Sequence, residues 1–156
     1  MSRVKDDRMK KPAHRKTKAT KCELVCRSEP REIAKVEKFL AKVNKTAHLD
    51  DGTNYRLLVA TTEAVNNAII HGNKLDPKKL VRISCRILDR TLVVTVRDGG
   101  KGFNPKSLAN PLEEQNLLKE NGRGIFLIRS LVDDVGFQMH KTGTSVIMKL
   151  DLSRLE

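Results

Sequence analysis

The feature that most constrains this chain is a predicted helix with a polar stripe, followed along the sequence by two glycine-rich turns. Between Thr53 and about His71 the apolar residues recur at helical spacing and fill one arc of that helix. Glu63, Asn67 and His71 stand at positions i, i+4 and i+8, so they line one edge beside the apolar arc. An ordinary amphipathic helix also has a polar side, and the helix taken alone favours this simpler interpretation.

The residue types on this edge suit magnesium and phosphate chemistry. The amide oxygen of Asn67 is a hard, neutral ligand, and Mg2+ usually takes only one or two protein ligands and leaves its other positions to water and phosphate oxygens. The carboxylate of Glu63, one turn away, is suited to orient or deprotonate an attacking hydroxyl. We therefore single out Glu63 as a candidate catalytic residue and Asn67 as a candidate metal and nucleotide ligand.

The first glycine-rich turn follows a predicted strand at residues 92–97. The strand ends in Asp98, and three of the next four residues are glycine, which lets the backbone turn sharply and approach a ligand. The Asp98 carboxylate can accept a hydrogen bond from an exocyclic amino group, such as that of adenine. A glycine-rich hairpin turn is the simpler alternative.

The second glycine turn, Gly122-Arg123-Gly124, opens an apolar-periodic stretch that predicts a helix ending near Gly136. Free N–H groups at the start of a helix favour phosphate. One G-x-G sequence is weak evidence, but the three motifs in this order indicate a nucleotide pocket.

Three runs carry a resemblance to a known superfamily: EAVNNAIIHG at residues 63–72, DGGKGFNP at 98–105 and GRGIFLIR at 122–129. They resemble the N, G1 and G2 boxes of the GHKL ATPases, and within that superfamily they are most similar to the bacterial anti-sigma factor serine protein kinases of the RsbW type. The similarity runs from about Lys21 to Leu152. Asn104 stands where many relatives carry Asp. Residues 105–121 match less well, so the resemblance does not define the conformation of a lid in this segment.

The resemblance implies a role for each matching residue. It implies a catalytic Glu63, a Mg2+-binding Asn67 and an adenine-binding Asp98, with Thr144 as a second, weaker adenine contact. The glycines that shape the base pocket would be Gly100 and Gly102, and the residues at the phosphates would be Gly122, Arg123 and Gly124.

The activity that the resemblance implies is transfer of phosphate from ATP, with Mg2+, to a serine of a small anti-sigma factor antagonist. It also implies that the protein sequesters a sigma factor and forms a homodimer. The alternative is a sequestration module that binds nucleotide only as a structural ligand and has no kinase activity. A nucleic-acid binder is a third interpretation, but the predicted strands within 81–97 have no aromatic residue on which bases stack.

The charge is concentrated at the start of the chain. The net charge is +12, and residues 1–21 account for seven of those charges because they hold nine Lys or Arg and two Asp. This stretch has almost no apolar residues, so we predict a basic disordered tail at 1–21 and a kinase domain at 22–156.

The lack of an apolar targeting segment and the number of cysteines favour a cytoplasmic protein. The sequence has no apolar run near the roughly 20 residues of a membrane span and no signal-peptide apolar region, so neither a membrane nor secretion is expected. Three cysteines without an export signal indicate reduced thiols. A zinc site at Cys22 and Cys26 would need further ligands, and only His14 is near in sequence, so buried core cysteines are the favoured interpretation.

The alternation of apolar and polar residues at 22–26, 81–87 and 146–152 predicts strands with one apolar face. Helices predicted at Pro30 to about Ala47, around Glu63 and after Gly124 would cover that face. The expected architecture is an α+β two-layer sandwich, a mostly antiparallel sheet covered on one face by helices. The resemblance implies the same kind of fold, the Bergerat-type ATP-binding fold. The long stretch Lys101 to Asn121 is interpreted as a functional lid.

Overall fold

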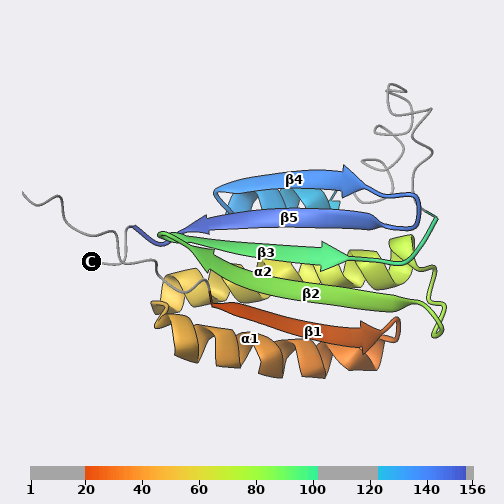
Figure 1. The fold of residues 1–156 in the computed structure, drawn as a ribbon, viewed down its shortest axis with the longest axis horizontal. Coiled ribbons are helices and arrows are strands. Elements are labelled where there is room, and N and C mark those ends of the chain that lie inside the picture. Colours follow the sequence, from red (N-terminus) through yellow and green to blue (C-terminus); the bar gives the residue numbers. More distant parts are fainter. Residues whose placement is uncertain (1–19, 102–122, 154–156) are drawn as a thin grey trace, which may run out of the picture.

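The computed structural model describes residues 20–101 and 123–153, which form a sheet and a layer of helices on one of its faces (Figure 1). The sheet has five strands in the order β1-β2-β3-β5-β4, and every neighbouring pair is antiparallel. The α+β two-layer fold predicted from the sequence is therefore confirmed. The strands are β1 (Lys21–Arg27), β2 (Leu80–Leu88), β3 (Thr91–Arg97), β4 (Asp134–Met139) and β5 (Thr144–Asp151).

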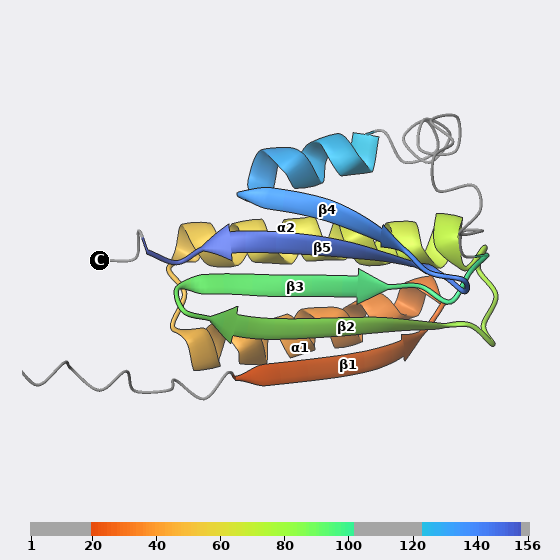
Figure 2. The same cartoon turned by 45° about the horizontal axis from the view of Figure 1, so that its top comes forward.

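The helices lie together behind the sheet, as both views show (Figures 1 and 2). Pro30 begins a 3-10 turn, η1 (Pro30–Glu32), which leads into α1 (Ile33–Ala47) and confirms the predicted helix. A long helix, α2 (Asp51–Asn67), follows and ends in a π-helical turn, η2 (Ala68–Gly72). A shorter helix at residues 123–131 precedes β4.

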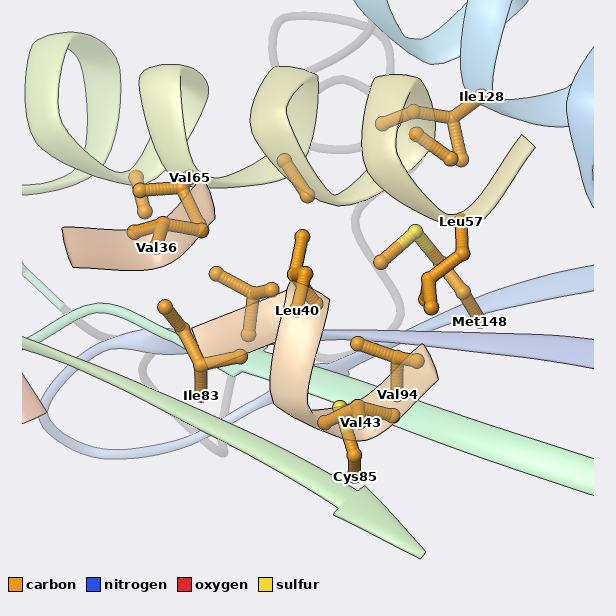
Figure 3. Close-up of a cluster of buried hydrophobic side chains, with 14 of the residues drawn as sticks. Val36, Leu40, Val43, Leu57, Val65, Ile83, Cys85, Val94, Ile128 and Met148 are labelled. Carbon is orange, nitrogen blue, oxygen red and sulfur yellow. The ribbon is translucent and has the colours of Figure 1, made fainter. Parts of the chain in front are cut away.

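The core lies between the two layers, where the apolar arc of α2 and the buried face of α1 meet the sheet (Figure 3). The strands bury alternate residues, as the sequence pattern predicted. Each large aliphatic side chain buried in this way contributes about 1.5–3 kcal/mol of transfer free energy. Because its apolar arc is fixed against the sheet, α2 has little freedom to rotate and its polar edge is held in place. The core residues labelled in Figure 3 are Val36, Leu40, Val43, Leu57, Val65, Ile83, Cys85, Val94, Ile128 and Met148.

Both ends of α2 differ slightly from the prediction. The helix starts at Asp51, ahead of Thr53, because the Asp50 side chain accepts a hydrogen bond of 2.6 Å from the Thr53 N–H and caps the helix. At the other end Asn73 N–H donates to the Ala68 carbonyl, five residues back. This wider turn ends the regular helix at Asn67, and π-helical turns occur frequently at functional sites.

The predicted extent of the last helix is wrong. The helix ends at residue 131 and not near Gly136, which lies in the middle of β4. The chain leaves the helix because Asp133 N–H donates to the Lys149 carbonyl at 2.9 Å, which begins the pairing of this segment with β5. Val135 and Phe137 continue that pairing opposite Met148 and Val146, so the last part of the predicted helix belongs to a strand.

Several expectations fall on residues outside the described ranges. Gly102, Gly122, His14, residues 1–19 of the basic tail and most of the proposed lid belong to this group. Among the described residues, the three cysteines are free, and no cluster of three or more His, Cys, Asp or Glu has the arrangement of a metal site. None of the described helices is long and apolar enough to cross a membrane.

Candidate nucleotide-binding site

The polar edge of α2 meets the start of the helix at 123–131. A Cβ placed on Gly124 would lie 2.8 Å from Asn67 Nδ2 and 3.2 Å from Glu63 Oε2, so the Gly124 backbone lies directly beside both side chains. Neither side chain forms a hydrogen bond or ion pair with another residue in the ranges 20–101 and 123–153. The N–H groups at the start of a helix attract phosphate oxygens. This corner therefore combines a carboxylate, an amide and helix N–H donors.

Asp98 is fixed at the end of β3 by backbone hydrogen bonds. Its Oδ1 accepts from Gly100 N–H at 3.0 Å and from Thr144 N–H at 3.2 Å. Burial raises the pKa of the Asp98 carboxyl above its usual value, and the two backbone hydrogen bonds oppose that rise. Oδ2 accepts no hydrogen bond from another residue in the ranges 20–101 and 123–153, and it lies against Gly72.

Three glycines surround Asp98 at van der Waals distance. A Cβ on Gly72 would overlap the Asp98 carboxylate, and a Cβ on Gly143 would overlap the Asp98 carbonyl oxygen. Gly143 also has a φ of +99°, a conformation that side-chain-bearing residues rarely adopt. A Cβ on Gly100 would overlap the Gly72 carbonyl oxygen. These close approaches bring the end of η2, the turn after β3 and the turn before β5 into direct contact.

A cavity of about 360 Å³ lies between these elements. Its size falls in the range of small-ligand pockets, which is about 300–1,000 Å³. Apolar side chains form much of the wall, and a few polar groups point to recognition of a specific ligand. The lining residues that the argument uses are Asn67, His71, Asp98, Ile125, Phe137 and Thr144.

The structure brings most of the predicted site residues together. Asn67, Asp98 and Thr144 line the cavity, while Glu63 and Gly124 lie beside Asn67. Gly100 lies in the turn after Asp98, where its N–H donates to Asp98 Oδ1. Arg123 is exposed at the start of its helix. Gly102 and Gly122 fall outside the described ranges.

Sequence reasoning missed two contributors to this site. Phe137 lines the cavity from β4, a strand that the sequence analysis did not predict. Asn73 is fully buried and donates or accepts three side-chain hydrogen bonds next to the Asp98 turn. An Asn between a helix and a strand is typical of an ordinary loop. The only feature of the sequence that could have indicated its role is its position directly after His71 and Gly72.

Fold and site together define a protein of the class that has a pocket of ligand size between a helical layer and an antiparallel sheet. A model of the histidine kinase-like ATPase domain matches residues 26–150. The chain belongs to this family, as the GHKL resemblance indicated.

Several proteins named anti-sigma F factor are similar to most of this chain. The anti-sigma F factor of Anoxybacillus flavithermus is 36% identical over 114 residues, which are 71% of this chain and 75% of that protein. The anti-sigma F factor of Heyndrickxia coagulans is 34% identical over 131 residues, covering 81% and 86% of the two chains. That of Clostridium perfringens strain SM101 is 32% identical over 132 residues, covering 81% and 91%.

Two solved structures share the fold. The RsbU and RsbW domains of a Mycobacterium tuberculosis protein align with a TM-score of 0.64 at 18% identity, over 86% of this chain. This chain spans only 33% of that structure. The blue-light activated histidine kinase of Erythrobacter litoralis aligns with a TM-score of 0.54 at 21% identity, over 78% of this chain and 42% of that one.

Proposed function

We propose that this protein is an ATP-dependent serine protein kinase and anti-sigma factor, which phosphorylates an antagonist protein and sequesters a sigma factor. The relatives named anti-sigma F factor support the regulatory part of this proposal. The observation that carries the catalytic part is the contact of Gly124 with both Glu63 and Asn67, beside the cavity that Asn67 shares with Asp98.

The adenine and the phosphates of ATP would bind at opposite ends of the site. The adenine amino group would donate to the Asp98 carboxylate, with Thr144 as a second contact on the same cavity wall. The phosphates would lie at the corner of Asn67 and Gly124, where helix N–H groups favour negative charge.

The donor set at this corner fits a magnesium ion. The Asn67 amide oxygen is a neutral oxygen ligand, and the side chain has no hydrogen-bond partner among the described residues that would compete for it. A bound Mg2+ would offset the negative charge that develops on the phosphate oxygens during transfer.

Glu63 would act on the acceptor serine. In the proposed step the serine oxygen forms a bond to the γ-phosphorus, the bond from that phosphorus to the β,γ-bridging oxygen breaks, and ADP leaves. Glu63, one helical turn from Asn67, would orient the serine hydroxyl and accept its proton.

The experiment that tests the proposal incubates the purified protein with γ-labelled ATP, Mg2+ and the small proteins encoded beside its gene. We expect label on a serine of one of them, appearing at least roughly a hundredfold more slowly when Glu63→Gln replaces the wild-type protein. If the wild-type protein binds ATP and its partners but transfers no label, the sequestration module without kinase activity replaces the kinase. Homodimer formation and a cytoplasmic location belong to the same proposal.

A further inference from the structure

Asn73 connects three segments that are far apart in the sequence. Its Nδ2 group donates to Ser28 Oγ at 2.6 Å and to the Leu80 carbonyl at 3.1 Å, and its Oδ1 accepts from Gly99 N–H at 2.7 Å. Ser28 Oγ in turn donates to the Lys79 carbonyl at 2.6 Å. Figures 1 and 2 both show the ends of β1, β3 and α2 and the start of β2 at the same end of the molecule.

Complete burial makes this network selective for asparagine. The Asn73 side chain is 0% exposed and Ser28 is 1% exposed, so water cannot replace a lost partner without rearrangement. The side chain supplies two donors and one acceptor, and each of them has a partner. An apolar residue at position 73 would leave Gly99 N–H and the Leu80 carbonyl without that partner.

The contact with Gly99 acts on the turn that holds Asp98. Gly99 lies between Asp98 and Gly100, whose N–H donates to Asp98 Oδ1. The residue before Asn73, Gly72, lies against the Asp98 carboxylate. Two consecutive residues at the end of η2 therefore hold three consecutive residues of this turn.

We infer that Asn73 is a positioning residue for recognition of the nucleotide base. Its amide oxygen holds Gly99 N–H, which sets the turn so that Asp98 Oδ2 faces the base while Oδ1 remains bound to the backbone. From the opposite side, the Leu80 carbonyl, which accepts a hydrogen bond from Nδ2, orients the Asn73 amide. This inference rests on the proposed nucleotide-binding function and adds a residue to it.

The test compares Asn73→Ala with Ser28→Ala. Both variants remove buried hydrogen bonds of the same network, but only the first removes the acceptor for Gly99 N–H. The affinities for ADP and GDP are measured by titration calorimetry, well below the midpoint temperature of thermal unfolding of each variant. The ratio of the two affinities reports base recognition and is not moved by a uniform loss of stability.

We expect Asn73→Ala to weaken ADP binding by roughly ten- to a hundredfold and to reduce the preference for ADP over GDP. Ser28→Ala should unfold at a lower temperature and keep a preference within about twofold of the wild type. Asn73→Asp retains an acceptor oxygen and should recover much of the preference although it loses the donors. If Asn73→Ala does not fold, Asn73→Ser is compared with Asn73→Asp in the same way.

An unchanged preference in Asn73→Ala, or in Asn73→Ser, overturns the inference and leaves Asn73 with a structural role only. An equal loss in Ser28→Ala overturns it too, because the Gly99 contact would then not be the deciding one. A wild-type protein that binds neither nucleotide overturns the proposed function as well. Wild-type binding of ADP without phosphate transfer affects the kinase proposal alone and leaves the role of Asn73 supported by the variant comparison.

Discussion

The backbone of Gly124 lies against the side chain of Asn67, with only 2.8 Å between the position of an added Cβ and Asn67 Nδ2. The two residues belong to different helices, so this contact fixes how the start of the helix at 123–131 meets the polar edge of α2. It also means that space for the Asn67 side chain depends on the absence of a side chain at position 124.

Gly124→Ala should therefore impair nucleotide binding without impairing folding. Alanine favours a helix more than glycine does, so the free energy of unfolding should not fall. The added methyl group would displace the Asn67 side chain, and we expect affinity for Mg-ADP to fall about tenfold or more, which corresponds to a loss of about 1.4 kcal/mol. Calorimetric titration with Mg-ADP measures the change.

Gly136→Ala provides the matched control. Gly136 lies in β4, and a Cβ there would meet nothing within 4 Å. This variant should bind Mg-ADP as the wild type does. Wild-type affinity in Gly124→Ala would show that the contact with Asn67 has no role in binding.

Asn67→Ala should weaken ATP binding far more in Mg2+ than in EDTA. The reason is that the proposed lost group is a metal ligand and not a contact to the base. Asn66→Ala, a neighbouring asparagine of α2 that does not line the cavity, serves as the control and should leave both affinities unchanged. Equal losses for Asn67→Ala in the two conditions would limit Asn67 to supporting the fold.

The sequence predicted the layers and three of the helical segments because these follow from periodicity and glycine placement. Alternation gave the buried faces of β2 and β3, and helical spacing placed Glu63 and Asn67 on one edge. These are local patterns, which a single sequence displays directly.

The parts that sequence analysis missed depend on tertiary contacts. Val135 continues the helical spacing of Ile128, Leu131 and Val132, and only pairing with β5 makes it part of a strand. Similarly, nothing local distinguishes Asn73 from a solvent-exposed loop residue, because its partners Ser28 and Gly99 are 45 and 26 residues away. Such contacts require the assembled sheet.

The pH dependence of stability should reveal the burial of Asp98. Because the folded-state pKa of Asp98 is raised, the folded protein keeps this proton to higher pH than the unfolded chain does. The unfolded state then binds fewer protons, so the contribution of Asp98 to the free energy of unfolding falls as the pH rises from about 4 through the raised pKa.

Asp98→Asn isolates that contribution. The Asn side chain keeps an oxygen acceptor for the Gly100 and Thr144 N–H groups but does not titrate. The free energy of unfolding of the wild type minus that of Asp98→Asn, measured by denaturant titration, should decrease with pH over this window. A difference that is constant, or that rises with pH, would contradict the raised pKa.

The three thiols should differ in reactivity in the folded protein. Burial raises the pKa of Cys26 to about 11 and that of Cys85 to about 12, so little thiolate forms at these positions near pH 8. Cys22 is only partly buried at the edge strand β1. With a disulfide reagent we expect one thiol to react quickly and two to react only after unfolding. The fast phase should disappear in Cys22→Ser, and its persistence there would show that a buried cysteine is accessible.

Glu63→Gln should separate catalysis from binding. The substitution keeps the shape and the helical propensity of the residue but removes the group that is proposed to act on the serine hydroxyl during transfer. General-base contributions are typically about 10² to 10⁴-fold, so phosphorylation of the antagonist should slow at least roughly a hundredfold, while affinity for ATP and for protein partners changes little. Glu37→Gln, at an exposed position on α1, is the control and should phosphorylate at the wild-type rate. If Glu63→Gln is as fast as this control, Glu63 is not the catalytic residue, and its place beside Gly124 must be explained by ligand binding or by folding.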